Sequence, residues 1–416
     1  MIDYIKSLPK EKVVGVASLV GSSAFNVLAG VLISHFIAKM ISPEDYGGYY
    51  YAINLIASAC VFLSFGAFYT TSRLILLAGC NLSVRRLHGV SLKLTLALSV
   101  FISILLLLAY FFDTGLVDES VRPLILLAPL GALVTLLNSY FEVVLPADNR
   151  LGLIAKARLY PKMLYGLIVV GAYYLDIPWV KGAFELLFFY FLASFICYSI
   201  FSIEIRPDFR GGDKEFKSFF RESRTYGIHV YLGSIFSVGG TALTGVAIGL
   251  LSDSRADVGY YALATSLCAP LSILPAALVT ASFSGFTNLN CISKGLFIAT
   301  ASISILAAVV LCGLSDYVVE MLWGGNYFKV SEYVYMLTAA FVLYALSDLI
   351  NRFLAAKGNG PALRNSSFIV GIVLIVSTFT LVDQYGGIGA AYARVAAGVA
   401  YIVCMVVFYK KQISTA

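Results

Sequence analysis

The sequence predicts an all-α integral membrane protein, and its composition and apolar pattern support that fold class. Of the 416 residues, 60% are hydrophobic and only 12% are charged, whereas a soluble domain carries roughly 25% charged residues. The apolar residues also form long runs, many near the length of about 20 residues that a helix needs to cross the bilayer core. Twelve runs of this kind would use most of the chain, which leaves little sequence for an extramembrane domain.

The apolar runs are interpreted as about 12 transmembrane helices. Open strands cannot satisfy their backbone hydrogen bonds in lipid, and the runs lack the alternating pattern of a barrel strand. The first run is too long for the apolar part of a signal peptide, so it is predicted to span the membrane. The runs lie near residues 13–38, 47–71, 90–112, 123–145, 162–176, 183–203, 227–251, 259–284, 295–314, 332–354, 367–382 and 388–408.

Basic residues predict the orientation of the spans. If both termini are cytoplasmic, 23 Lys and Arg residues lie in inner segments and 5 in outer segments, while Arg394 lies inside the last run. The inner segments include the loop before the fifth run, with Lys156, Arg158 and Lys162. An excess of Lys and Arg in cytoplasmic loops is typical of membrane proteins. The asymmetry also accounts for the net charge of +6 without a nucleic-acid partner.

An internal repeat predicts how the spans are organised. Residues 41–49 follow the first run, and the similar residues 253–261 follow the seventh, 212 positions later. A second pair, residues 144–149 and 353–358, is separated by 209 positions. Because each half contains an even number of spans, the two halves would insert in the same orientation as parallel repeats.

The repeat therefore predicts three parts of the chain. Residues 1–205 form an N-terminal six-helix lobe, residues 206–226 a cytoplasmic linker loop and residues 227–416 a C-terminal six-helix lobe. Two such lobes leave a cavity that can be exposed to each side of the membrane in turn. The tyrosines at positions 49–51 and 260–261, where the second and eighth spans begin, are interpreted as interfacial anchors.

Motifs for catalysis and metal binding were sought and not found in the sequence. There is no P-loop, nucleophile elbow or H-E-x-x-H segment. The seven cysteines show no C-x-x-C pairing and mostly lie within apolar runs, as small buried residues do. We therefore expect a transporter rather than an enzyme, with no cofactor and no metal site.

Five motifs, in chain order, resemble segments of the polysaccharide transporter family, part of the MATE-like flippase superfamily. The resemblance implies a V-shaped transporter of two six-helix lobes. Length and span number are most similar to the O-antigen (Wzx-type) flippases, which move an undecaprenyl-diphosphate-linked oligosaccharide from the cytoplasmic to the periplasmic leaflet. The motifs are IAKMISPEDYGGY at 37–49, VGYYA at 258–262, LWGGNY at 322–327, LAAKGN at 354–359 and GGIGAA at 386–391.

This resemblance implies a multi-pass protein of a bacterial inner membrane with both termini cytoplasmic. Its expected partners are a lipid-linked oligosaccharide, membrane lipids and polysaccharide assembly proteins, and the chain is expected to be a monomer. Coupling to H⁺ or Na⁺ is left open. The alternative function is a cation-coupled small-solute or multidrug antiporter of the same fold. A membrane polysaccharide polymerase fits less well, because the outer loops are short.

Ionisable residues within or near spans are candidates for the substrate-binding cavity or a gate, because such residues normally face protein or water. Arg394 is a candidate for contact with phosphate or sugar, or for a structural ion pair. Glu142, Asp348 and Arg352 lie on equivalent spans, where Asp348 and Arg352 form either a local i, i+4 ion pair or part of a gate.

Other candidates lie along the first span and at span ends. Small and hydroxyl residues on the first and seventh spans predict helix packing or cavity lining, and Asn26 is the residue best suited to hydrogen-bond a sugar. Arg73, Arg224 and His229 border inner loops, where they set orientation or capture a diphosphate. His35 lies near the outer end of the first span.

Overall fold

The computed structural model describes residues 10–78, 82–112, 119, 121–177, 180–210, 212–273, 275–276, 286 and 291–414. The side chains of residues 10–20, 22–24, 229, 233–234 and 237–238 lie outside the described part of the chain. Within these ranges the structure consists of helices joined by short connections, without a strand. The predicted all-α fold class is confirmed.

The chain divides into two compact units. One contains Val14–Ala242, and the other contains Leu243–Ala416 together with Met1–Val13. The division falls within α12 (Gly240–Leu251). The predicted symmetry between two six-helix lobes stays a prediction.

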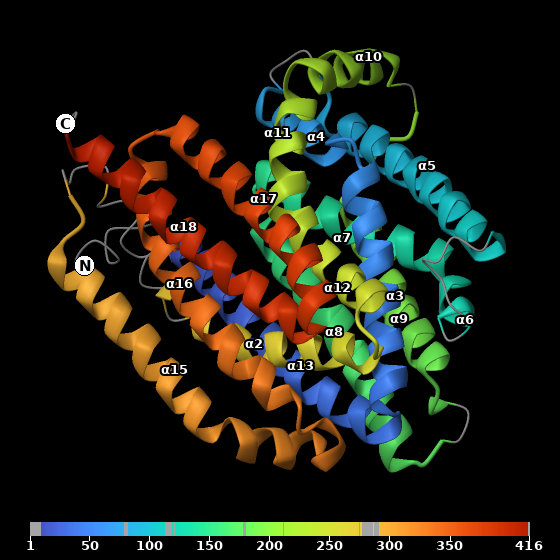
Figure 1. Cartoon of the computed structure of the whole chain (residues 1–416). Helices are drawn as coiled ribbons and strands as arrows, with labels where there is room; N and C mark the ends of the chain where they lie inside the picture. The colour runs from blue at the N-terminus through green and yellow to red at the C-terminus, as the bar shows by residue number, and fades with distance from the viewer. Residues whose placement is uncertain are drawn as a thin grey trace. The chain divides into compact units, whose positions relative to one another are not determined.

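The unit Val14–Ala242 is a helical bundle in which α7 packs against α3, α5 and α9, and α8 packs against α9 (Figure 1). Its elements are α2 (Lys10–Met40), α3 (Pro43–Leu63), α4 (Ala67–Leu76), α5 (Val84–Phe111), α6 (Arg122–Ile125), α7 (Ala128–Val144), η1 (Leu145–Asp148), α8 (Leu151–Tyr174), α9 (Ala183–Glu204), α10 (Asp213–Glu222), η3 (Ser223–Gly227), α11 (Ile228–Ser234) and η4 (Ile235–Gly239).

The second predicted span is bent rather than straight. Ser42 caps α3 by accepting a hydrogen bond from the Asp45 N–H, and Pro43 begins the helix where its missing N–H costs nothing. The chain then turns by 56° between α3 and α4. Phe65 and Gly66 have positive φ angles of 47° and 71° at this turn, and these angles end the helical hydrogen-bonding pattern.

The fifth predicted span begins earlier than expected. Lys156, Arg158 and Lys162 were predicted to lie in a loop, and that prediction is wrong, because α8 runs continuously from Leu151 to Tyr174 through these residues and Pro161. Their cytoplasmic side stays a prediction. The basic residues and the proline had masked the first half of the helix. This correction matters for the site, because it puts Arg158 and Lys162 inside the bundle.

The predicted linker, residues 206–226, packs onto the unit Val14–Ala242 through the ends of α4 and α5. It contains α10, which lies close to α4 (Figure 1) and buries Phe219 and Glu215 while Phe216 and Phe220 stay exposed. The Glu215 carboxylate accepts a hydrogen bond of 3.4 Å from the Ser83 N–H. The predicted linker is therefore partly helical and docked on α4 and α5.

Asp208 fastens the same segment to α5. Its N–H donates to the Arg85 carbonyl at 2.9 Å, and its carboxylate lies 3.3 Å from the Arg86 Nε. The Arg210 N–H, together with Arg86, holds the pKa of the Asp208 carboxyl below its usual value, because both donors favour the charged form.

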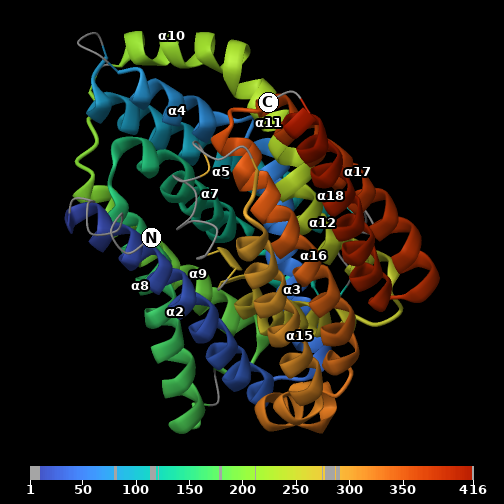
Figure 2. The same ribbon diagram turned by 90° about the vertical axis from the view of Figure 1, so that its left-hand side faces the viewer.

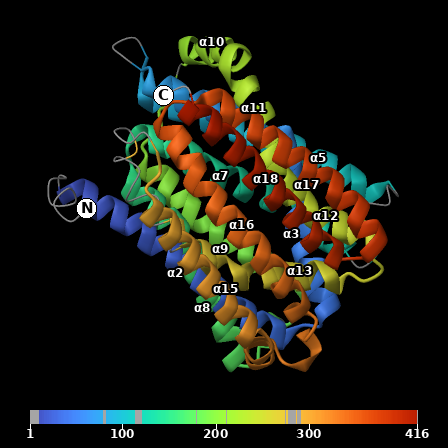
Figure 3. The ribbon, with the colours of Figure 1, turned by 60° about the vertical axis from the view of Figure 1, so that its left-hand side comes forward.

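The unit Leu243–Ala416 is built around α16, which packs against α13, α15 and α18, while α17 packs against α18 (Figure 3). One part of its core gathers Phe286, Leu349, Phe353 and Met405, all nearly inaccessible to solvent. Its further elements are α13 (Ala256–Cys268), η5 (Ala269–Ser272), α15 (Lys294–Trp323), η6 (Gly325–Tyr327), α16 (Val330–Ala356), α17 (Gly360–Tyr385) and α18 (Ile388–Ser414).

Seven helices in the described residues are long and apolar enough to cross a membrane, and the bent pair α3 and α4 would make an eighth span. The helix α8 is long enough but not apolar enough to be counted among them, because of its basic residues. These helices establish a multi-pass membrane protein.

Four of the five tyrosines that were predicted to be interfacial anchors, at the start of α3 and α13, are buried instead, while Tyr50 is half-buried. Tyr49 and Tyr51 are buried at 3% and 0% exposure, and Tyr260 and Tyr261 at 8% and 7%. Their rings pack inside the two units because α3 and α13 are covered by neighbouring helices. This burial gives one of them a part in the site described below.

Candidate functional site

A polar cavity of about 550 Å³ lies inside the unit Val14–Ala242. Helices α2, α3, α7, α8 and α9 surround it, so the cavity is enclosed by most of the long helices of this unit. The polar residues that line it are Asn26, Thr135, Asn138, Glu142, Arg158, Lys162, Tyr190, Ser194 and Tyr198.

Glu142 and Arg158 form the central ion pair of this cavity. The Arg158 Nε donates to Glu142 Oε1 at 2.7 Å, and Nη2 donates to Oε2. This two-point arrangement matches the planar guanidinium to the planar carboxylate. Because both side chains keep about a third of their exposure, 31% and 32%, the pair faces the cavity rather than a dry core.

Lys162 places a second cation in the same cavity. Its Nζ donates a hydrogen bond of 3.0 Å to the Asn26 carbonyl on α2. The Asn26 side-chain oxygen is buried and has no hydrogen-bond partner among the described residues. A buried amide oxygen without a partner is costly, and it is suited to accept a hydrogen bond from a hydroxyl group that enters the cavity.

Asn138 and Tyr198 supply further hydrogen-bonding groups. The Tyr198 hydroxyl donates to Asn138 Oδ1 at 2.9 Å, which leaves the two N–H donors of the amide for a ligand. The exposed Asn138 side chain lies one helical turn before Glu142 on α7. The cavity thus combines amides and hydroxyls with two cations and one carboxylate.

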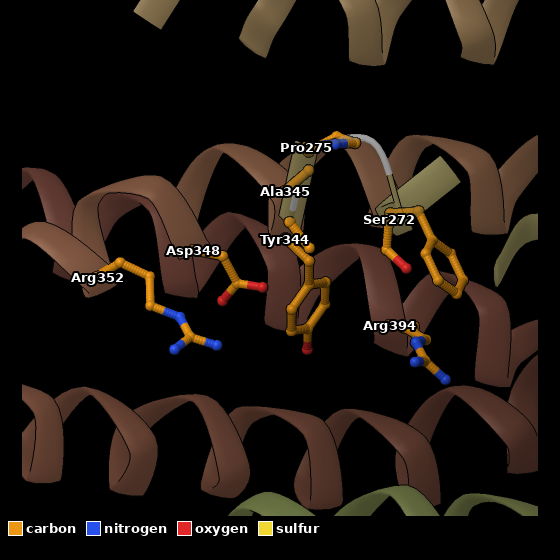
Figure 4. A pocket seen from close by; sticks show the side chains of 9 residues that line it. Ser272, Pro275, Tyr344, Ala345, Asp348, Arg352 and Arg394 are labelled. Atoms are coloured by element: carbon orange, nitrogen blue, oxygen red, sulfur yellow. The ribbon is translucent and has the colours of Figure 1, made fainter. Parts of the chain in front are cut away.

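A second cavity, of about 310 Å³, lies inside the unit Leu243–Ala416. Figure 4 shows Arg352, Asp348 and Tyr344 in a row on one side of α16, with Arg394 of α18 nearby. Ser272 contributes a hydroxyl from the end of η5. This cavity also contains two cations and one carboxylate.

Arg394 is held by aromatic residues rather than by an acid. Its Nη1 donates to the Tyr261 hydroxyl at 3.2 Å, and its guanidinium lies 5.3 Å from the centre of the Phe341 ring. Neither contact neutralises the charge, although both orient it. The structural ion pair that the sequence analysis considered for Arg394 is not formed within the described part of the chain.

Asp348 is fixed by a hydrogen-bonded tyrosine. The Tyr401 hydroxyl donates to Asp348 Oδ1 at 3.0 Å and accepts a bond of 2.8 Å from the Asn351 amide. Asp348 does not form the expected i, i+4 ion pair with Arg352 among the described side chains. Arg352 is exposed within the cavity and keeps its charge available.

The structure therefore brings five predicted residues into two cavities. Asn26 and Glu142 line one cavity, and Asp348, Arg352 and Arg394 line the other. Their grouping within each unit is an observation, and their role in binding stays a prediction.

The remaining predicted residues lie elsewhere. Arg73 pairs with Glu222 at 2.6 Å and lies 4.2 Å from the Tyr226 ring, so it holds the end of α10. Arg224 is exposed on η3, and His35 is half-buried beside Phe36 on α2. None of these three lines either cavity. The His229 side chain lies outside the described residues.

Sequence reasoning missed the cavity residues Arg158 and Lys162, and also Tyr261, the hydrogen-bond partner of Arg394. Arg158 and Lys162 were counted as loop residues, although their spacing of four positions would have placed them on one helical face. Tyr261 was interpreted as a lipid anchor, and no sequence signal pointed to its contact with Arg394 across 133 positions.

Comparisons with known proteins identify the fold. Neither a scan against protein-family models nor a search of curated proteins gave a match. Among solved structures, the chain is similar to the lipid II flippase MurJ in an inward closed conformation, with a TM-score of 0.73 and 17% identity over 95% of this chain and 89% of MurJ.

Two further structures share the same architecture. One is an inward-facing multidrug resistance MATE family transporter of the MOP superfamily, with a TM-score of 0.68 and 15% identity over 94% of this chain and 95% of that one. The other is a MOP superfamily transporter from Pyrococcus furiosus, with a TM-score of 0.54 and 14% identity over 96% of this chain and 94% of that one. The chain is thus a multi-pass membrane protein with a MATE-like fold.

Proposed function

We propose that the protein is a flippase that moves an undecaprenyl-diphosphate-linked oligosaccharide from the cytoplasmic to the periplasmic leaflet by alternating access. The observation that carries this proposal is the charge balance of the cavities. Arg158 and Lys162 outnumber Glu142 in one, and Arg352 and Arg394 outnumber Asp348 in the other. Each cavity thus has a formal excess of one positive charge, which favours an anionic ligand.

The proposed substrate needs such cavities because its headgroup is too polar for hydrocarbon. Burial of a hydroxyl without a hydrogen-bond partner costs several kcal/mol, roughly 2–7, and an oligosaccharide carries many hydroxyls. Asn26, Asn138 and Ser272 offer amide and hydroxyl groups to replace water. Guanidinium groups suit diphosphate oxygens because their N–H donors match them in pairs.

A cation-coupled antiporter for small solutes or drugs is the second candidate. It is favoured by the MATE transporters among the similar structures and by one carboxylate in each cavity, Glu142 and Asp348, which could exchange a proton or a cation. The excess of cations weighs against a cationic drug, because like charges repel within a cavity of low dielectric constant.

Removal of the gene from its host tests the two candidates against each other. A flippase predicts that the lipid-linked oligosaccharide accumulates on the cytoplasmic leaflet and that surface polysaccharide is lost. Complementation with Arg394→Lys should restore more export than Arg394→Ala at equal membrane levels, because the charge that Tyr261 orients is retained. Intact surface polysaccharide combined with new sensitivity to cationic drugs would support the antiporter instead.

A further inference from the structure

We infer that a groove between α2 and α8 binds the isoprenoid chain of the lipid-linked substrate while its headgroup occupies the neighbouring polar cavity. This inference rests on the proposed function and adds a binding site for the lipid tail. The groove has a volume of about 510 Å³ and lies within the unit Val14–Ala242. Its lining consists of Gly21, Phe25, Gly152, Ala155, Lys156, Leu159, Tyr160 and Met163.

The helices α2 and α8 are neighbours (Figure 2) and meet where Lys162 and Gly166 face α2. Where they are close, a Cβ atom on Gly30 would lie 3.3 Å from Lys162 Nζ, and one on Gly166 would lie 3.3 Å from the Ile33 side chain. Nearer the N-termini, a Cβ on Gly21 or Gly152 would meet no atom of the described residues within 4 Å. The space left there is the groove.

The groove is apolar and wide enough for a branched chain. Phe25, Tyr160 and Met163 are exposed at 42%, 44% and 42%, and the glycines leave space between them. A methyl-branched isoprenoid is bulkier across its axis than a straight acyl chain, so it gains more contact from an open groove with aromatic sides.

The polar cavity lies on the other side of the same helix pair. Along α2, Phe25 lines the groove and Asn26 lines the cavity; along α8, Met163 lines the groove and Lys162 lines the cavity. The Lys162 ammonium crosses the gap to the Asn26 carbonyl at 3.0 Å. An amphiphile with phosphate between its tail and its sugars would therefore meet a cation where the apolar and polar surfaces join.

The orientation predicted from the basic residues puts this groove in the inner leaflet. Both helices then start at the cytoplasmic side, so the groove near their N-terminal ends faces the leaflet in which the lipid-linked substrate is made. Lys156, at the groove, pairs at 3.0 Å with Glu204 at the end of α9. The substrate tail would enter directly from lipid, while its headgroup passes between α2 and α8.

Photolabelling tests this site in the full chain in phosphatidylcholine nanodiscs. The probe is undecaprenyl phosphate with a benzophenone near the end of its chain. We expect labelled peptides from Gly21–Phe25 and Gly152–Met163. Gly152→Leu should reduce the labelling by about tenfold, one decade in apparent Kd, because its side chain fills open space in the groove. Gly171→Leu is the matched control, since Gly171 also has open space but lies further along α8.

The outcomes separate the tail site from the proposed function. Labelling on other helices, equal labelling of Gly152→Leu and Gly171→Leu, or full competition by an equal amount of phosphatidylglycerol would overturn the isoprenoid site. Transport of the lipid-linked oligosaccharide that persists in a Gly152→Leu protein without labelling would also overturn the site but leave the flippase intact. Normal labelling without any transport would retain the site and refute the flippase.

Discussion

The Glu142–Arg158 pair supports a stability prediction that its geometry makes quantitative. An exposed ion pair contributes about 0–1 kcal/mol, whereas breaking a buried pair costs about 3–5 kcal/mol. With 31% and 32% of the side chains exposed, this pair lies between these limits. We therefore expect Arg158→Ala to lower the free energy of unfolding by about 2 kcal/mol, because Glu142 is left without its partner.

A double-mutant cycle measures the coupling of the two residues directly. Glu142→Ala, Arg158→Ala and the double variant would be unfolded reversibly in mixed micelles, with a coupling energy of about 1–2 kcal/mol expected. The control is Lys156 and Glu204, a pair at 3.0 Å whose side chains are 43% and 49% exposed. The coupling energy of this control pair should be no more than about 0.5 kcal/mol. Equal coupling in both cycles would refute the reasoning.

Three further predictions concern the docked segment and the topology. Gly89→Ala should make residues 206–210 accessible to protease and lower the free energy of unfolding by about 2 kcal/mol, because its Cβ would overlap the Asp208 carbonyl. Unchanged cleavage would contradict this prediction. Folding lowers the pKa of the Asp208 carboxyl. The ionised carboxylate therefore contributes to stability at pH values above the usual Asp pKa of about 4, and this contribution is lost as the pH falls through the folded-state pKa. The hydrogen-exchange protection factor of the segment, which is corrected for the intrinsic effect of pH on exchange, should fall in that acidic range, but it should stay constant there in Asp208→Asn. Reporters inserted at Lys214 and after Lys411 should behave as cytoplasmic, and a periplasmic signal at either site would overturn the topology.

The sequence predicts the helices well where apolar residues are continuous and poorly where charges interrupt them. The run at 183–203 corresponds closely to α9 (Ala183–Glu204), because its residues are apolar on all sides. The first half of α8 escaped prediction because Arg158 and Lys162 are polar and Pro161 is a helix breaker in water. Inside the bundle a carboxylate and a carbonyl satisfy the two cations.

Five members of the candidate site were predictable from the sequence, but Arg158, Lys162 and the contacts between residues were not. An ionisable residue within an apolar run draws attention by its cost in lipid, and Arg394 and Asp348 were found in this way. Their partners Tyr261 and Tyr401 are separated from them by 133 and 53 positions and carry no distinguishing pattern. Arg73 illustrates the opposite error, because it was predicted as a binding candidate but pairs with Glu222 in the segment predicted to be a linker loop.

Reconstitution tests the central claim most directly. Purified protein in liposomes would be supplied with an undecaprenyl-diphosphate-linked oligosaccharide in one leaflet, and transfer would be measured by the access of a glycosidase to the sugar from the other side. The account predicts transfer that depends on the protein and that Arg394→Ala reduces. Absence of transfer by protein that binds and exports a cationic dye in the same liposomes would contradict it.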